Sequence, residues 1–398
     1  MTEASVRPFL ISWNITKRCN LKCAHCYLDA VELAGKDDIS TAEALVFLDK
    51  IAIDAPDAML ILTGGEPLLR PDIYDVASYA NSKGLTVVLG TNGTLIDREA
   101  ARRIRESGIK GAGVSVDSIE PSFHDSFRGV KDAWQKTVEG LQYLKDERID
   151  FQIHATVTKE NRGRLRRLAS FAGETGARGV NFFFLVCTGR GEKMSDITPA
   201  EYEEALKEIV ELSNEGGVAA RARCAPHILR LTGPSSALST GTSGCIAGKG
   251  YLRISPDGLV TPCPYMPVTR QSMSLRDFTI AEIIAGDASF RLLSAPSLKG
   301  RCRDCEFAET CGGCRARALS DSGDIMGEDG WCSYEPKPRA DLDKSEPVWT
   351  GEAIERLAKV PAFLRPMVKK GVERYAKAKG LSEITPDVMA ELKSRYRG

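Results

Sequence analysis

Short apolar runs alternate with amphipathic stretches along the first half of the chain, from Phe9 to about Cys187. The stretches Thr41–Ile53 and Asp72–Gly84 have the spacing of helices. Strands are predicted over Leu10–Thr16, Met59–Thr63, Thr86–Gly90, Gly113–Asp117, Phe151–Thr158 and Val180–Val186. Six βα units in series predict a parallel sheet with helices outside it, either as an open sheet or as a partial barrel. Functional residues of such a sheet lie at the carboxyl ends of its strands.

The second half of the chain follows other patterns. Thr198 and Glu201 have the spacing of a capping box and predict the start of a helix. Thr232–Gly244 is predicted to be a loop, and the cysteine-dense region after it has short strands and many turns. A polar linker, Glu335–Pro347, precedes a helical, basic tail. We therefore divide the chain into residues 1–195, a helical connector 196–244, a cysteine-rich region 245–336 and a small helical tail domain 349–398.

Composition and charge argue against several classes of function. The chain has 398 residues, and its 54 basic side chains are balanced by 54 acidic ones. This balance gives no reason to expect a nucleic-acid partner. The sequence has no apolar run of transmembrane length and no signal peptide at its start. We therefore expect a cytoplasmic protein without a membrane partner.

Twelve cysteines need a reason other than disulfides, since a reducing compartment keeps thiols free. Cys19, Cys23 and Cys26 lie just after the first predicted strand. Three thiolates on such a loop can hold three irons of a [4Fe–4S] cluster and leave the fourth iron open. A structural zinc site is the alternative, but it needs a fourth ligand, and His25 is the only local candidate.

Further motifs follow the next strands in order. They are Leu62–Asp72 (LTGGEPLLRPD), Gly90–Thr94 (GTNGT) and Val114–Ser118 (VSVDS). Together with the cysteine loop, they resemble the radical S-adenosylmethionine (SAM) enzymes from about Arg7 to Gly191. The resemblance implies a partial (β/α)6 barrel over residues 1–195 and an open iron that binds SAM. It also implies SAM contacts from Tyr27, Gly64, Gly65, Glu66, Pro67, Asn92, Ser115 and Arg128.

Each of these residue types suits its implied contact. Glycines let the backbone approach a ligand, and Glu66 offers an anion to the methionine ammonium group. Tyr27 resembles the aromatic residue placed against adenine, and Ser115 or Asn92 could bond the ribose or the carboxylate. Arg128 could pair with the SAM carboxylate in bidentate fashion. Each of them also has a structural reading as a turn or surface residue.

The cysteines from Cys245 to Cys332 resemble the SPASM extension of some radical SAM enzymes, which carries two auxiliary [4Fe–4S] clusters. The resemblance assigns Cys245, Cys263 and Cys314 to the first cluster, and Cys302, Cys305, Cys311 and Cys332 to the second. Cys224 could supply a fourth ligand to the first; otherwise that iron is open. The last interval, Cys311-Gly-Gly-Cys314, has two residues where the family has three. Cys187 is expected to be a small buried residue.

Segments Phe182–Leu206, Gly244–Val268 and Leu298–Asp324 closely resemble the enzymes of alternative haem b synthesis and haem d1 synthesis. Those enzymes remove carboxylates, or side chains that bear them, from the rim of an iron tetrapyrrole. Four basic residues could pair with propionates, although a solvated basic surface explains each one too: Arg190, Lys249, Arg315 and Arg317.

These resemblances imply that a reductant such as flavodoxin or ferredoxin supplies an electron that cleaves SAM. The resulting 5′-deoxyadenosyl radical would abstract a hydrogen atom from the substrate. We therefore expect an enzyme that oxidatively decarboxylates or trims propionate or acetate groups of an iron tetrapyrrole. A peptide- or protein-modifying maturase with the same clusters is the alternative. An electron carrier is disfavoured, because a carrier has no need of Gly64–Pro67 beside an open iron.

The tail carries a resemblance of its own. Residues 360–393 resemble the small helical module that ends one subunit of the light-independent protochlorophyllide reductase. Two short helices are expected there, and Thr385 could cap the second of them. A plain helical interaction module is the alternative.

Overall fold

A computed structural model of the chain describes residues 8–31, 35–36, 38–194, 197–232, 244–337, 347–360, 365–379 and 381–395. The chain forms two compact units, Met1–Glu335 and Pro336–Gly398. Residues 233–243 of the predicted loop and residues 338–346 of the predicted linker lie outside the described residues.

The first unit is built on a nine-stranded sheet in the order β7-β6-β5-β4-β3-β2-β1-β8-β9. Its strands are β1 (Leu10–Thr16), β2 (Met59–Gly64), β3 (Thr86–Thr91), β4 (Gly111–Ser115), β5 (Asp150–Val157), β6 (Gly179–Phe184), β7 (Ala219–Arg223), β8 (Tyr251–Ile254) and β9 (Val260–Thr261). Neighbouring strands from β7 to β8 are parallel, and β9 is antiparallel to β8. The carboxyl ends of eight strands therefore lie at one edge of the sheet.

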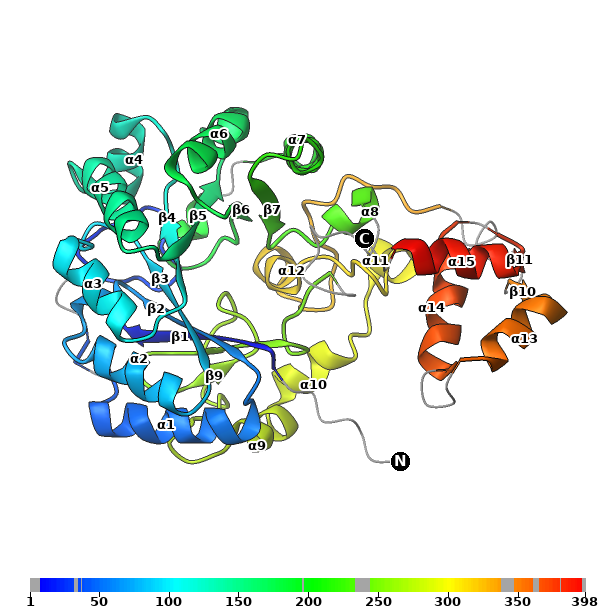
Figure 1. The fold of residues 1–398 in the computed structure, drawn as a ribbon, viewed down its shortest axis with the longest axis horizontal. Coiled ribbons are helices and arrows are strands. Elements are labelled where there is room, and N and C mark those ends of the chain that lie inside the picture. The colour runs from blue at the N-terminus through cyan, green and yellow to red at the C-terminus, as the bar shows by residue number, and fades with distance from the viewer. Residues whose placement is uncertain are drawn as a thin grey trace. The chain divides into compact units, whose positions relative to one another are not determined.

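Helices follow the strands and line the outer side of the curved sheet (Figure 1). They are α1 (Thr41–Asp54), α2 (Ile73–Ser82), α3 (Arg98–Glu106), α4 (Pro121–Arg128), α5 (Ala133–Asp146), α6 (Leu165–Thr175) and α7 (Pro199–Asn214). Trp13 of β1 is fully buried beneath α1, with its ring centroid 6.0 Å from that of Phe47. The capping box predicted at Thr198 and Glu201 is present at the start of α7. The partial barrel of βα units is thus confirmed.

The six predicted strands match β1 to β6, with ends that differ by at most two residues. The sheet does not stop there. The segment predicted to be a helical connector contributes β7 as well as α7, and the cysteine-rich region contributes β8 and β9. The sequence of β7, AARAR, alternates alanine with arginine and lacks the β-branched residues that mark a strand.

The cysteine-rich region is made of short elements. The connector ends with α8 (Ile228–Thr232), and the helices of the cysteine-rich region are α9 (Ile280–Gly286), α10 (Ala288–Ser294), α11 (Gly300–Asp304) and α12 (Arg315–Ser322). Outside this region, among the βα units, short 3-10 turns occur at Pro67–Leu69, Arg162–Arg164 and Gly189–Lys193. Within the described residues, no helix is both long and apolar enough to cross a lipid bilayer.

The second unit contains α13 (Gly351–Ala358), α14 (Arg365–Ala378) and α15 (Pro386–Arg395), with a two-stranded parallel sheet of β10 (Val348–Trp349) and β11 (Glu383–Ile384). Its own core includes the buried side chains of Ala353, Val372, Ala376 and Ile384. The amide of Val388 donates to the Thr385 hydroxyl at 3.5 Å, so Thr385 lies at the start of α15 as predicted.

Because each unit has a core of its own, we predict that a chain ending at Glu335 retains the fold and the iron content of the first unit. The measurements are iron per chain after anaerobic reconstitution and the midpoint of thermal unfolding, each compared with the full chain. A chain ending at Ser322 is the control, since it also removes Cys332 and is expected to lose iron. Loss of iron in both truncated chains would contradict the independence of the first unit.

Candidate functional site

The loop with the first three cysteines leaves the carboxyl end of β1 and lies against the end of α4. The amide of Lys22 donates to the carbonyl of Arg128 at 3.0 Å, and that of Ala24 to the carbonyl of Phe127 at 3.1 Å. The imidazole of His25 stacks on the Phe127 ring with centroids 4.4 Å apart. The loop is therefore held by backbone bonds and packing, and His25 faces a ring rather than the thiols.

The three thiols of this loop lie close together. Cys19 and Cys23 are buried and Cys26 is half-buried. Burial raises the pKa of the Cys19 thiol to about 12, and the nearby Glu66, Cys23 and Cys26 side chains also raise it. Burial therefore disfavours the ionised thiolates unless a metal binds them.

The donor set fits a multi-iron cluster. Within the part of the chain that the structure describes, no three Cys, His, Asp or Glu side chains are grouped tightly enough for a single metal ion. Each thiolate of a [4Fe–4S] cluster binds a different iron, so these ligands lie farther apart than those of one zinc ion. Three thiols on one loop, without a fourth donor, match such a cluster with one open iron.

The glycine motif after β2 packs directly on the start of the cysteine loop. A Cβ on Gly64, whose φ is +142°, would lie 2.4 Å from the Thr16 carbonyl oxygen, and one on Gly65 would lie 2.1 Å from that of Arg18. The amides of Gly65 and Glu66 donate to these two carbonyls at 2.9 and 2.7 Å. Side chains at either glycine would push the motif off the loop.

Glu66 is fully buried and joins the ends of two strands. Its carboxylate accepts bonds from the Thr91 hydroxyl at 2.8 Å and from the amides of Asn92 at 2.8 Å and Leu68 at 3.2 Å. Burial raises the pKa of Glu66 to about 7, against the lowering effect of these bonds. Pro67 follows as the first residue of a short 3-10 turn.

The other residues predicted to contact SAM lie around the same strand ends. The Tyr27 hydroxyl accepts a bond from the Asn14 amide at 2.9 Å. Asn92 donates to the Asn20 side chain, which lies between Cys19 and Cys23, at 2.9 Å. Ser115 is the last residue of β4 and is half-buried. The sequence did not single out Asn14 and Asn20, which become part of this group only through folding.

Arg128 has a protein partner that the sequence did not assign to it. Its Nε lies 2.6 Å from an oxygen of Asp117, and its Nη1 lies 3.7 Å from the Cys23 sulfur. Burial alone would raise the pKa of Asp117, but the Arg128 guanidinium, nearby imidazoles and the Thr156 amide together hold that pKa below its ordinary range. The amide of Thr156 donates to the other carboxylate oxygen at 2.8 Å. The sequence feature that could have identified Asp117 as a site residue is its position in the VSVDS motif at a strand end.

The second group of thiols comes from four separate segments. Its members are Cys224, Cys245, Cys263 and Cys314. Burial raises the pKa of Cys263 well above its ordinary value, and the nearby thiols of the other three raise it further. Cys224 follows β7 directly and has a φ of +55°, which a residue with a side chain rarely adopts. The structure thus places Cys224 beside the other three cysteines, where the sequence left either Cys224 or an open iron as the alternatives.

The third group consists of Cys302, Cys305, Cys311 and Cys332. Burial raises the pKa of Cys311 to about 12, and the nearby Cys332 thiol adds to the effect. Backbone amides approach two of the sulfurs, from Phe307 to Cys305 at 3.4 Å and from Gly313 to Cys311 at 3.5 Å. Hydrogen bonds to sulfur tune the potentials of iron–sulfur clusters. Cys187 is buried, as predicted, and belongs to none of the three groups.

Cys311 and Cys314 are separated by only two glycines, yet they belong to different groups of thiols. Gly312 and Gly313 have φ values of +63° and +67°, so two successive residues adopt the left-handed conformation. Cys314 then caps the start of α12. Two residues suffice here because both are glycines.

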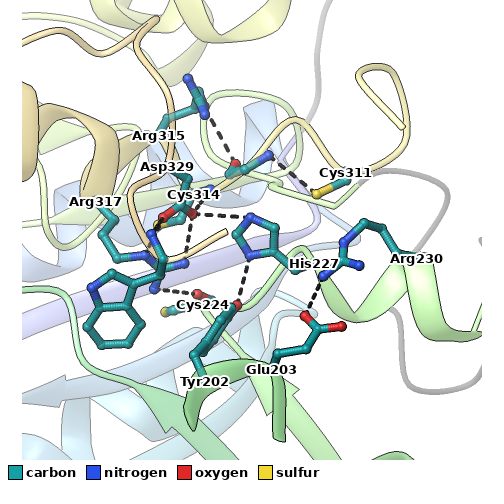
Figure 2. A network of polar contacts seen from close by, with 12 residues as sticks. Tyr202, Glu203, Cys224, His227, Arg230, Cys311, Cys314, Arg315, Arg317 and Asp329 are labelled. Atoms are coloured by element: carbon teal, nitrogen blue, oxygen red, sulfur yellow. Dashed lines mark hydrogen bonds and ion pairs between the residues drawn. The ribbon is translucent and has the colours of Figure 1, made fainter. Parts of the chain in front are cut away.

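A buried ion pair lies beside Cys224 and Cys314 (Figure 2). Arg317 donates to both oxygens of Asp329, at 2.7 and 2.8 Å. The amide of Cys314 donates to Asp329 at 2.7 Å, and Arg317 donates to the Cys224 carbonyl at 3.2 Å. The amide of Cys332 bonds to the Asp329 carbonyl at 3.0 Å. The pair therefore contacts segments that carry cysteines of the second and third groups.

Neutral side chains complete this network (Figure 2). The Tyr202 hydroxyl lies 2.9 Å from Nδ1 of His227, whose Nε2 lies 3.6 Å from Asp329. Burial lowers the pKa of His227 to about 4, so its ring is neutral near pH 7. The Trp331 ring lies under the Arg317 guanidinium, 4.6 Å from its central carbon.

The structure corrects three of the four basic residues considered for propionate binding. Arg315 and Arg317 are buried, and Arg315 donates to the carbonyls of Ile325 and Gly327 at 3.0 and 2.7 Å. Arg190 donates to the carbonyls of Cys23 and Ala30, both at 2.9 Å. These guanidinium groups hold the protein together. They are not part of a solvated basic surface.

Family models match three parts of the chain. The Radical SAM superfamily model matches residues 13–172, and the iron–sulfur cluster-binding domain model, SPASM, matches residues 245–306. A model of the proto-chlorophyllide reductase 57 kD subunit matches residues 349–393, in the second unit. The fold and these matches define a radical SAM enzyme with a SPASM iron–sulfur domain.

Whole-chain relatives narrow this class. The AdoMet-dependent heme synthase of Methanosarcina barkeri is 38% identical over 84% of this chain and 98% of that protein. The pre-heme d1 synthase of Dinoroseobacter shibae is 30% identical over 86% of this chain and 91% of that protein. The chain belongs to the family of the AdoMet-dependent heme synthases.

The fold has a solved counterpart. The crystal structure of Streptococcus suis SuiB bound to S-adenosylmethionine superposes with a TM-score of 0.68, at 15% identity. The match covers 83% of this chain and 78% of SuiB. At this identity the likeness concerns the fold alone.

We predict that Asp329→Asn destabilises the first unit by about 3–5 kcal/mol, because it leaves the Arg317 cation buried without its counter-charge. Urea unfolding and iron content per chain measure the effect. The double variant Arg317→Met, Asp329→Leu should regain part of the stability. Glu328→Gln breaks the exposed pair with Arg301 and serves as a control, with an expected loss below about 1 kcal/mol. Wild-type stability in Asp329→Asn would contradict the assignment.

Proposed function

We propose that this protein removes carbon dioxide from propionate side chains of an iron tetrapyrrole by radical SAM chemistry, as a step in haem synthesis. The observation that carries the proposal is the 38% identity to a heme synthase along 84% of the chain. The match of the tail to a protochlorophyllide reductase subunit agrees with it, since protochlorophyllide is also a tetrapyrrole.

The three groups of thiols are the proposed cofactor ligands. Cys19, Cys23 and Cys26 would hold the cluster that binds SAM, and the motif residues Tyr27, Gly64–Pro67, Asn92 and Ser115 would line the SAM site. The second and third groups would each hold an auxiliary [4Fe–4S] cluster, with Cys224 as the fourth ligand of the first one. When bound with SAM, the open-iron cluster supplies a 5′-deoxyadenosyl radical that takes up a hydrogen atom.

The electron balance of the proposed decarboxylation suggests a role for the second and third groups of thiols. Loss of carbon dioxide, one hydrogen atom and one electron turns a propionate into a vinyl group. The reaction therefore needs an electron acceptor besides the radical, and an electron donor such as flavodoxin or ferredoxin to start each SAM cleavage. Free thiols of this kind are kept in a reducing compartment, which favours the cytoplasm.

The direct test is an anaerobic reaction of the reconstituted protein with SAM, dithionite and iron coproporphyrin III. We expect 5′-deoxyadenosine, carbon dioxide and a porphyrin in which vinyl groups replace propionates, measured by mass spectrometry. Cys26→Ala should abolish all three products. An unchanged porphyrin, together with modification of a peptide encoded beside this protein, would overturn the proposal in favour of a peptide maturase.

The ligand role of Cys224 gives a separate prediction. Cys224→Ala should lower the iron content by up to one cluster, about four iron atoms per chain, because a four-thiolate site loses a ligand. Cys187→Ala is the matched control, since it removes a buried thiol outside the three groups. Iron analysis and electron paramagnetic resonance of the reduced protein measure the change. Equal iron in both variants would show that Cys224 is not a ligand.

A further inference from the structure

The inner face of the sheet, opposite the helices, carries polar side chains. Residues alternate between the two faces of a strand, and one face of β1 to β8 contributes to the apolar core. The residues between those core positions include Ser12, Asn14, Gln152, His154, Asn181, Arg221, Arg223 and Arg253. A face of this kind, at a strand-end site, is where a substrate of a partial barrel binds.

Two arginines of the inner face differ from most arginines that are buried elsewhere. Four others form ion pairs with carboxylates, namely Arg70 with Asp72, Arg128 with Asp117, Arg230 with Glu203 and Arg317 with Asp329. Arg253 is only 7% exposed and Arg223 is half-buried, yet no carboxylate among the described residues pairs with either. Arg315 has no carboxylate partner in the described part of the chain either, but it donates to the carbonyls of Ile325 and Gly327. A buried cation without a counter-charge is costly, so proteins pair such cations or use them to bind anions.

Both arginines are oriented in the same way. Arg223 donates from Nε to the side-chain oxygen of Asn181 at 2.8 Å. Arg253 donates from Nε to the side-chain oxygen of Asn14 at 2.6 Å. Both asparagines are buried. In the described part of the chain these are the only side-chain hydrogen bonds of the two guanidinium groups, so the Nη1 and Nη2 donors of each are left for a ligand.

The two arginines lie beside different groups of thiols. Arg223 ends β7 and precedes Cys224, whereas Arg253 lies on β8, with its guanidinium carbon 5.9 Å from the centre of the Tyr27 ring. The strands β7 and β8 are the two ends of the run of parallel strands. An anion bound by either arginine would therefore lie close to the proposed redox centres.

We propose that Arg223 and Arg253 bind carboxylates of the tetrapyrrole substrate, each pairing its free Nη donors with one propionate. The inference rests on the proposed function, because it names the residues that recognise that substrate. Arginine presents two parallel donors that match the two oxygens of a carboxylate. A tetrapyrrole carries several propionates on its rim, so one molecule can engage both arginines. Arg221, on the same face of β7, adds positive charge to this region.

The experiment is a titration of the reconstituted protein with iron coproporphyrin III, followed by the shift of its absorption band. We expect Arg223→Gln and Arg253→Gln each to raise the Kd about tenfold or more, since each loses a charge-assisted bidentate contact. Arg223→Lys and Arg253→Lys should lose less, because the charge stays. The tetramethyl ester of the same porphyrin should bind all these proteins and the wild type equally.

Arg178→Gln is the matched control, because Arg178 is exposed and pairs with Asp150 on the surface. It should leave the Kd unchanged. Iron content, measured for each variant, identifies proteins that failed to assemble. If a glutamine variant fails in this way, the lysine variant and the ester titration of the wild type decide the question.

The outcomes separate this inference from the proposed function. A wild-type protein that does not bind the porphyrin contradicts the proposed function. A wild-type protein that binds it, with both glutamine variants binding equally well, overturns the role of the two arginines. SAM binding, measured by equilibrium dialysis, should change less than porphyrin binding in the glutamine variants. Loss of SAM binding with intact porphyrin binding would assign the arginines to the SAM carboxylate instead, which also overturns the inference.

Discussion

The buried ion pair between Arg317 and Asp329 determines how the cysteine-rich region is held together. Two ions removed from water are stable only when their attraction is joined by further hydrogen bonds. Here the Cys314 amide, the Cys224 carbonyl and the Trp331 ring supply these contacts. The elements of this region are too short to form a large core, so a polar network sets positions that apolar packing sets elsewhere.

The same pair connects the cysteine-rich region to the sheet. Cys224 follows the edge strand β7, and Cys263 follows β9 at the opposite end of the sheet order. Their thiols nevertheless belong to one group. Both ends of the open sheet are therefore tied to α12, which begins after Cys314. This explains why residues 1–335 form one compact unit, although family models divide them into two domains.

Parts of this structure were predictable because their signals are local. Strands with one apolar, buried face have alternating β-branched and large apolar residues, which is why β1 to β6 were found within two residues. The strand β7 was missed because its AARAR pattern has a polar inner face and small core residues. Asp117 and Asp329 were missed because each is defined by its partner arginine, 11 and 12 residues away in sequence. Such pairs depend on tertiary packing, and the periodic pattern of apolar residues does not reveal which charged residues will meet.

Arginines show the limit of sequence reasoning most clearly. The sequence offered Arg190, Arg315 and Arg317 as candidates for an anionic ligand and did not single out Arg223 or Arg253. The structure separates them by how their donors are used. Where carbonyls or a carboxylate take up the donors, the guanidinium group stabilises the fold. Where only Nε is bonded and the cation is buried or half-buried, the missing counter-charge can come from a ligand, and its binding then offsets the cost of burial.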